Sequence, residues 1–174
     1  MRRLLSLLVA FLFPVLLAPA CGKPAPASRT VYGLSGKIQV ELPPGWEEMP
    51  DLHESADIEA GSKSADAYLV VVSERREILR SKSLEDYSQF TRDALVSTMS
   101  FPQHLGPRRK RIDGRLALQY EIRAIGKFGT RLVELHTVVE SPEYFHQVVL
   151  WTSAERFKAN EPEMLAIVES FRER

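Results

Sequence analysis

Residues 108–125 read RRKRIDGRLALQYEIRAI, and this stretch decides the fold. Asp113-Gly114 is the strongest signal for a tight hairpin turn in the chain. After it, every second residue from Leu116 to Ile122 is a large apolar or aromatic side chain, as in a strand with one buried face. The sequence therefore predicts two antiparallel strands, residues 108–112 and 116–125.

Two further turns extend this hairpin. Lys127-Phe128-Gly129 and Ser141-Pro142-Glu143 separate two runs with the composition of strands, residues 130–140 and 144–152. Because each run follows its predecessor after a short turn, we expect an antiparallel meander.

The first part of the domain is also expected to be mostly strand. Residues 31–34 and 37–42 flank Ser35-Gly36, which suits a two-residue hairpin turn. A weak strand is predicted at 57–60. Residues 67–73 contain a continuous apolar run, which is typical of a central strand covered on both faces.

Two helices complete the prediction. Ser83 is a good N-cap with Asp86 in the capping-box position, and an apolar face that includes Phe90 continues to Met99. The second helix is expected at 161–173, with Asn160 as its cap and Pro162 in its first turn. The fold class is α+β, an antiparallel sheet flanked by helices.

The N-terminus has the layout of an export signal. Arg2 and Arg3 precede an apolar run, Leu4–Leu17, that is shorter than the ~20 residues of a membrane span. Residues 17–21 resemble the signal of bacterial lipoproteins, which implies cleavage before Cys21 and lipid on its sulfur. Residues 18–20 also fit the A-x-A rule for ordinary signal peptidase, which would cut the same bond and leave Cys21 without lipid.

The predicted organisation has three parts. Residues 1–20 are the signal peptide, residues 21–30 are a lipidated cysteine with a Pro/Ala-rich tether, and residues 31–174 are one domain. Gly22 follows the cysteine where Asp would indicate retention at the inner membrane. The expected location is therefore the outer membrane of a bacterial envelope, with the domain facing the periplasm.

Charge excludes one class of partner. The chain has 23 Lys and Arg against 23 Asp and Glu, and signal removal would take away two arginines. A near-neutral exported protein has no general attraction to nucleic acid. The expected partners are the membrane, through the lipid, and an envelope protein.

The layout resembles the PsbP/DcrB-like family. The resemblance rests on residues 42–46 after the early strand, residues 83–87 at the helix start, and the ending 144–171. It covers about residues 31–172 and implies an α/β/α sandwich. It also implies mostly non-enzymatic roles, among them assembly factors, envelope lipoproteins and secretion adaptors.

The histidines give one weak metal candidate. His136 and His146 lie on strands joined by the turn at 141–143. A register centred on residue 142 would make them neighbours on one face, and a shift of one residue would separate them. No cofactor is expected.

A catalytic constellation is not evident. His53, Ser55 and Asp57 alternate along one short segment, which is poor geometry for a triad, and Ser35 lacks the glycine spacing of a nucleophile elbow. We therefore expect no enzyme.

The sharpest charge cluster is Arg108, Arg109, Lys110 and Arg111. It is a candidate for contact with anionic lipid or an acidic partner. Strand alternation favours a plainer interpretation, in which the four side chains divide between two faces.

The leading hypothesis is a membrane-anchored, non-catalytic envelope lipoprotein that binds or helps to assemble a protein partner. The alternatives are an envelope hydrolase with an unrecognised site and a carrier of a metal or small ligand between the sheet and a helix. A cleft holding two strongly perturbed titratable groups would favour the hydrolase.

Overall fold

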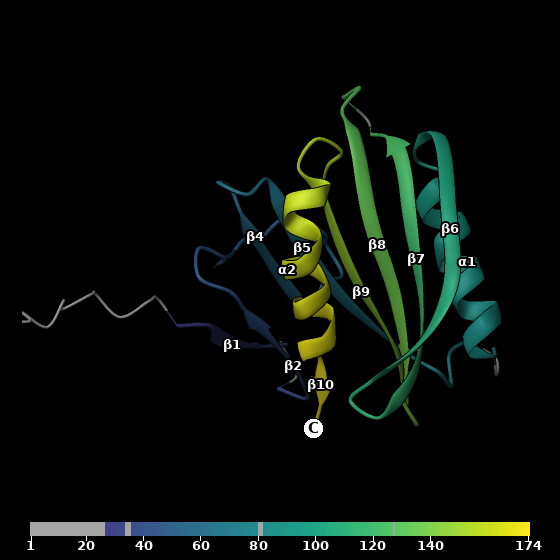
Figure 1. Cartoon of the computed structure of the whole chain (residues 1–174). Helices are drawn as coiled ribbons and strands as arrows, with labels where there is room; N and C mark the ends of the chain where they lie inside the picture. Colours follow the sequence, from purple (N-terminus) through teal and green to yellow (C-terminus); the bar gives the residue numbers. More distant parts are fainter. Residues whose placement is uncertain (1–26, 34–35, 80–81, 127) are drawn as a thin grey trace, which may run out of the picture.

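A twisted antiparallel sheet forms the middle of the molecule (Figure 1). The computed structural model describes residues 27–33, 36–79, 82–126 and 128–174. Within these ranges the sheet has seven strands in the order β3–β4–β5–β9–β8–β7–β6. Their bounds are β3 Glu47–Glu48, β4 Ile58–Ser62, β5 Ala67–Arg75, β6 Ser100–Ile112, β7 Arg115–Ile125, β8 Arg131–Glu140 and β9 Tyr144–Ser153.

A second, small sheet lies at one end of the main sheet. In the described residues it consists of β1 (Arg29–Tyr32), β2 (Ile38–Leu42) and β10 (Arg172–Glu173), with β2 in the centre. Strand β1 begins two residues before the predicted domain start at residue 31. The predicted Ser35-Gly36 turn falls partly outside the described residues.

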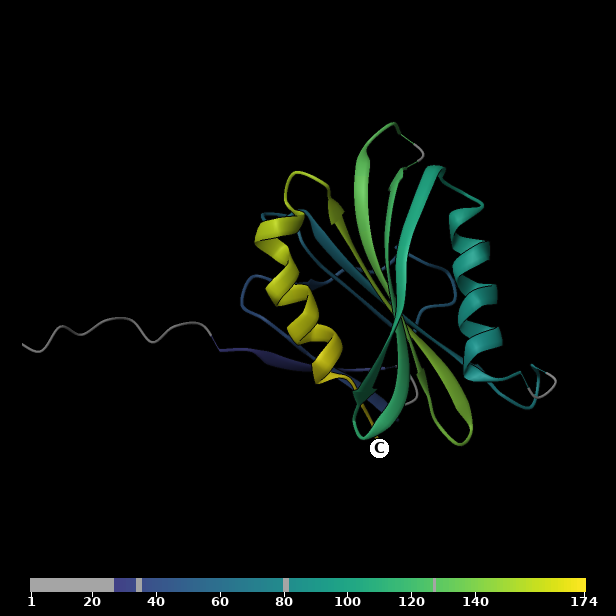
Figure 2. The same cartoon turned by 45° about the vertical axis from the view of Figure 1, so that its right-hand side comes forward.

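The two helices cover opposite faces of the main sheet. Helix α1 (Leu84–Val96) lies on one side and α2 (Phe157–Ser170) on the other (Figure 2). This arrangement is the predicted α+β sandwich. No helix in the described part of the chain has the length and apolar character needed to cross a bilayer.

The alternation of side chains between the two faces of the central strands explains the hydrophobic core on each side of the sheet. On β8, Val133 and Leu135 join the large core under α2, whereas Val138 belongs to a smaller cluster under α1. The α1 cluster also contains Tyr87 and Phe145, whose rings stack with centroids 4.6 Å apart. The two faces of one strand thus stabilise two separate cores.

The predicted meander is confirmed. Asp113 and Gly114 both have positive φ, 53° and 73°, which matches the twist of a tight hairpin between β6 and β7. Strands β7, β8 and β9 begin within one residue of their predicted starts. Ser83 caps α1 through the expected reciprocal bonds with Asp86.

Three local predictions were wrong. Strand β6 begins at Ser100 and contains ten exposed residues in a row, so it has no alternating pattern to detect. Phe90 is 54% exposed, because the buried stripe of α1 runs through Leu84, Tyr87, Ser88 and Thr91. Helix α2 begins at Phe157, and Asn160 does not cap it but donates its side-chain amide to Ala65 O and Thr152 Oγ1.

The register of β8 and β9 separates the two candidate histidines. Pro142 and Glu143 form a two-residue loop between Ser141 and Tyr144, so His136 pairs with Val149 and His146 pairs with Val139. His136 therefore lies on the α1 face and His146 on the α2 face. The two side chains cannot ligate one metal ion.

Candidate functional site

A cleft of about 430 Å³ opens on the α1 face of the sheet. Helix α1 covers β7 and β8, and the cleft lies beside it. Its floor is formed by β5, β8 and β9, and its walls are the end of α1 with Met99 and the segment that includes residues 52–55. A volume of ~300–1,000 Å³ is typical of pockets for small molecules.

The lining combines an apolar surface with a few polar groups. Apolar side chains come from every wall, and they include Leu52, Val70, Leu95, Val149 and Trp151. The polar residues are His53, Ser55, Glu74, Glu134, His136 and Gln147. Of the residues that the structure describes, no Lys or Arg lines the cleft, so its charged groups are acidic.

Glu134 is the most unusual group in the cleft. It lies on the central strand β8 and is only 4% exposed, and its Oε1 has no hydrogen-bond partner within the described chain. Burial without a compensating partner penalises the carboxylate and raises the pKa of Glu134 to about 8. The side chain is therefore mostly protonated near neutral pH.

His136 is two residues further along the same strand and is fully buried. Its Nε2 donates to Gln147 Oε1 at 3.3 Å, while its Nδ1 has no partner among the described residues. Burial, assisted by nearby Arg92, lowers the pKa of His136 to about 4. The neutral ring therefore presents Nδ1 as an unused acceptor.

Gln147 connects the histidine to the helix. Its amide nitrogen donates to Tyr87 Oη at 2.9 Å and to Glu74 Oε1 at 3.4 Å. Because a carboxylate only accepts, this fixes the amide with its oxygen toward His136. Burial and then the Glu74 carboxylate raise the pKa of Tyr87. The network orients the His136 ring without occupying its Nδ1.

Sequence reasoning found only part of this site. His136 was a candidate for a different reason, and His53 and Ser55 were considered as parts of a triad. The structure places His53 and Ser55 in the cleft wall, where Ser55 N donates to His53 Nδ1 at 3.2 Å. Glu134 was missed, although a carboxylate between Val133 and Leu135 on a central strand is itself a signal.

The two perturbed groups predict how stability depends on pH. Glu134 is protonated more readily in the folded chain than in the unfolded chain. The stability that this protonation contributes is therefore lost as pH rises from the ordinary pKa of 4.5 to the folded-state pKa of about 8. His136 acts in the opposite sense, and its contribution is lost as pH falls from 6.5 to about 4. A comparison of the parent with a Glu134 variant cancels the His136 effect and isolates the effect of Glu134.

We therefore expect the unfolding free energy of the parent to fall by about 1 kcal/mol between pH 6.5 and 7.5 relative to Glu134→Gln. Urea denaturation of both chains at the two pH values measures this difference. Parallel pH dependence of parent and variant would show that the carboxyl is not desolvated.

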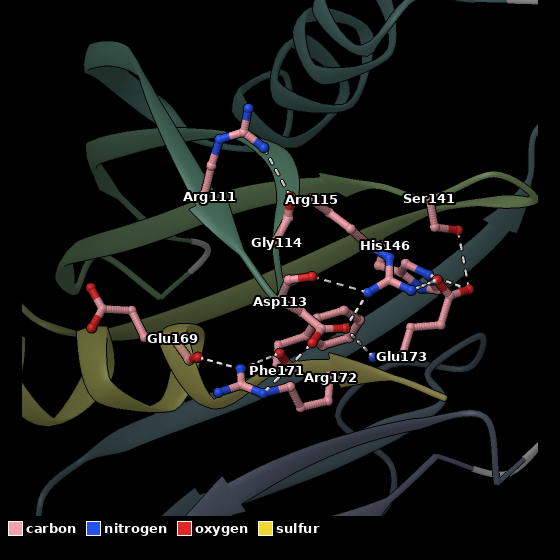
Figure 3. Close-up of polar contacts among 10 residues, drawn as sticks. All are labelled: Arg111, Asp113, Gly114, Arg115, Ser141, His146, Glu169, Phe171, Arg172 and Glu173. Carbon is pink, nitrogen blue, oxygen red and sulfur yellow. Dashed lines mark hydrogen bonds and ion pairs between the residues drawn. The ribbon is translucent and has the colours of Figure 1, made fainter.

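A second polar cluster, which is partly buried, lies on the α2 face, where the C-terminal strand meets the β6–β7 turn (Figure 3). Arg115 pairs with Asp113 and with Glu173, the latter at 3.1 Å. Glu173 also accepts from Ser141 Oγ at 3.1 Å and lies 3.3 Å from His146 Nε2. Burial lowers the pKa of His146, and Glu173 opposes that shift. The cluster holds the chain end to the main sheet.

The Arg115→Met substitution should lower the unfolding free energy by about 1–3 kcal/mol, because it removes the guanidinium that two partly buried carboxylates, Asp113 and Glu173, share. Arg109→Met is the matched control. It removes the exposed pair between Arg109 and Glu85 and should cost about 0–1 kcal/mol. Equal losses in urea denaturation would mean that the cluster does not stabilise the fold.

The basic cluster divides as strand alternation predicts. Arg109 reaches Glu85 of α1 at 2.7 Å, whereas Lys110 lies 3.7 Å from Glu169 of α2. Arg111 Nη1 donates to the Gly114 carbonyl. The structure therefore does not bring the four cations together on one face. Within the described residues there is also no group of three or more metal-ligating side chains.

Comparisons with known proteins show which solved structures have a similar fold. No protein-family model and no curated protein matches the sequence. Among solved structures, cyanobacterial PsbP (CyanoP) from Synechocystis is 14% identical with a TM-score of 0.63, covering 89% of this chain and 98% of that one. LpqN of Mycobacterium tuberculosis is 12% identical with a TM-score of 0.60, covering 83% and 89%.

A third similar structure is Mog1p, a Ran-binding protein of Saccharomyces cerevisiae. It is 11% identical with a TM-score of 0.55, covering 84% of this chain and 95% of its own. At these identities the likeness is one of fold. The chain therefore has a PsbP-like α+β fold, as the sequence resemblance implied.

Proposed function

We propose that this protein is a lipid-anchored module of a bacterial envelope whose domain binds its target without transforming it. The observation that carries the binding role is the cleft beside α1, whose lining includes Glu134 Oε1 and His136 Nδ1, two buried atoms without a hydrogen-bond partner among the described residues. Buried polar atoms are usually paired, so two atoms in one cleft that have no protein partner are suited to hydrogen-bond a molecule that enters it.

The likeness of fold supports the same role. LpqN is involved in cell envelope biogenesis, and Mog1p binds Ran. The anchor rests on residues 1–21, with cleavage before Cys21 and lipid on its sulfur. The tether after Cys21 would leave the cleft free to meet a partner beside the outer membrane.

The hydrolase alternative has one observation in its favour. The cleft holds two perturbed groups, Glu134 and His136, and this was the feature that would favour an enzyme. A covalent mechanism also needs an activated nucleophile. In the part of the chain that the structure describes, neither group is hydrogen-bonded to a Ser, Thr or Cys side chain. The geometry therefore supports binding better.

Photo-crosslinking in living cells tests the proposal. A photoreactive residue would replace Ser55 or Leu95 on the two walls of the cleft, with exposed Lys158 on α2 as the control position. We expect an adduct of defined mass from both cleft positions and none from the control. Identical products from all three positions, or none from the cleft, would contradict a binding role for this surface.

A further inference from the structure

We propose that the cleft binds a small organic ammonium ion with an apolar body, whose N–H groups donate to Glu134 and to His136 Nδ1. This inference deepens the proposed function and rests on it. It names the chemistry of the ligand and not a particular compound.

The unpartnered polar groups of the cleft need a ligand that donates hydrogen bonds. His136 uses Nε2 to donate to Gln147, so its free Nδ1 can only accept. An ionised Glu134 offers acceptors alone. A ligand with several N–H groups on one nitrogen satisfies both residues together, whereas a carboxylate or phosphate has no hydrogen to donate to His136 Nδ1.

The charge and shape of the cleft agree with a cation. Glu134 and Glu74 are acidic, and no basic side chain of the described residues lines the cleft. Trp151 lies directly opposite Glu134 in the register of β8 and β9, so the indole and the carboxyl group are cross-strand neighbours, and one face of the indole stacks on Tyr68. Aromatic faces attract ammonium groups, most strongly when water is excluded. The remaining apolar lining would receive the body of the ligand.

Binding should also depend on pH, because the ammonium ion needs the ionised carboxyl. Three titratable groups line the cleft with Glu134: His53 from the wall segment, Glu74 from β5 and His136 from the same strand. The residues directly opposite Glu134 on the neighbouring strands are Ile122 of β7 and Trp151 of β9. Helix α1 contributes apolar Leu95 to the lining, and its Arg92 acts on His136. Burial raises the pKa of Glu134 to about 8. Affinity should therefore rise by nearly tenfold from pH 6 to pH 7.

Three probes that share one apolar body test the proposal by calorimetry. They are phenethylamine, phenethyl alcohol and 3-phenylpropionate, which are cationic, neutral and anionic. The protein is the chain from residue 21 with Cys21→Ser, which keeps every described residue. We expect phenethylamine to bind at least tenfold more tightly than the alcohol, and no binding of the acid.

The Glu134→Gln substitution should weaken the binding of phenethylamine at least tenfold and remove the pH dependence of that binding between pH 6 and 7. Glu155→Gln, at an exposed position before α2, should change affinity less than twofold. Preference for the acid, an unchanged affinity in Glu134→Gln, or no amine binding up to ~10 mM would overturn the inference. Adducts from Ser55 and Leu95 in cells, without amine binding, would leave the proposed function standing and refute this ligand class alone.

Discussion

Cys21→Ser is expected to move the protein almost completely from the membrane fraction to the soluble fraction of the envelope. Each buried methylene of an acyl chain contributes about 0.8 kcal/mol to membrane attachment, and several chains together make it effectively permanent. Lipoproteins of the class that residues 17–21 resemble carry several chains. The variant removes the sulfur that would hold them.

The measurement is the distribution of the protein after cell fractionation. Residues 18–20 still allow ordinary signal peptidase to release the variant chain. Ser28→Ala, in the predicted tether, is the control and should stay with the membrane. A cleaved Cys21→Ser chain that still sediments with membranes would show that another part of the protein is the anchor.

Phe171→Ala is expected to have the largest effect on folding, a loss of about 3–5 kcal/mol in unfolding free energy. The side chain is fully buried in the large core under α2, with its ring centroid 5.1 Å from that of His146. It also lies between α2 and β10. Its loss would therefore open a cavity at the point where the two sheets meet. A typical domain has only about 5–15 kcal/mol of stability.

Phe90→Ala is the matched control for this truncation. Phe90 is exposed on α1, and its ring makes a cation–π contact with Lys82, 4.9 Å from ring centroid to nitrogen. Its loss should cost less than about 1 kcal/mol. Urea denaturation of both variants measures the contrast. Equal destabilisation by the two substitutions would mean that the core is not organised around α2 and β10.

The elements that were predicted well are those whose own residues carry the signal. Asp113-Gly114 forces a tight turn, and the alternation after it selects one buried face of β7. Ser83 and Asp86 bond each other locally, so the start of α1 needs no tertiary information. Strand β6 gave no such signal, because an edge strand with ten exposed residues in a row has no face to alternate.

The site was harder to predict because it depends on non-local packing. Glu134 is buried because the surrounding strands and the cleft walls remove it from water, although those walls are distant in sequence. A shift of one residue in the register of the two strands decides whether His136 lies beside His146 or on the opposite face of the sheet. The two-residue loop at Pro142 and Glu143 decided that question, and sequence alone left it open.

The most direct test of membrane anchoring is the mass of the N-terminal peptide of protein extracted from native membranes. We expect a peptide that begins at Cys21 and carries acyl chains on that residue. A peptide that begins at Met1, or a Cys21 with a bare thiol, would contradict the claim that this domain works as a module anchored to the envelope membrane.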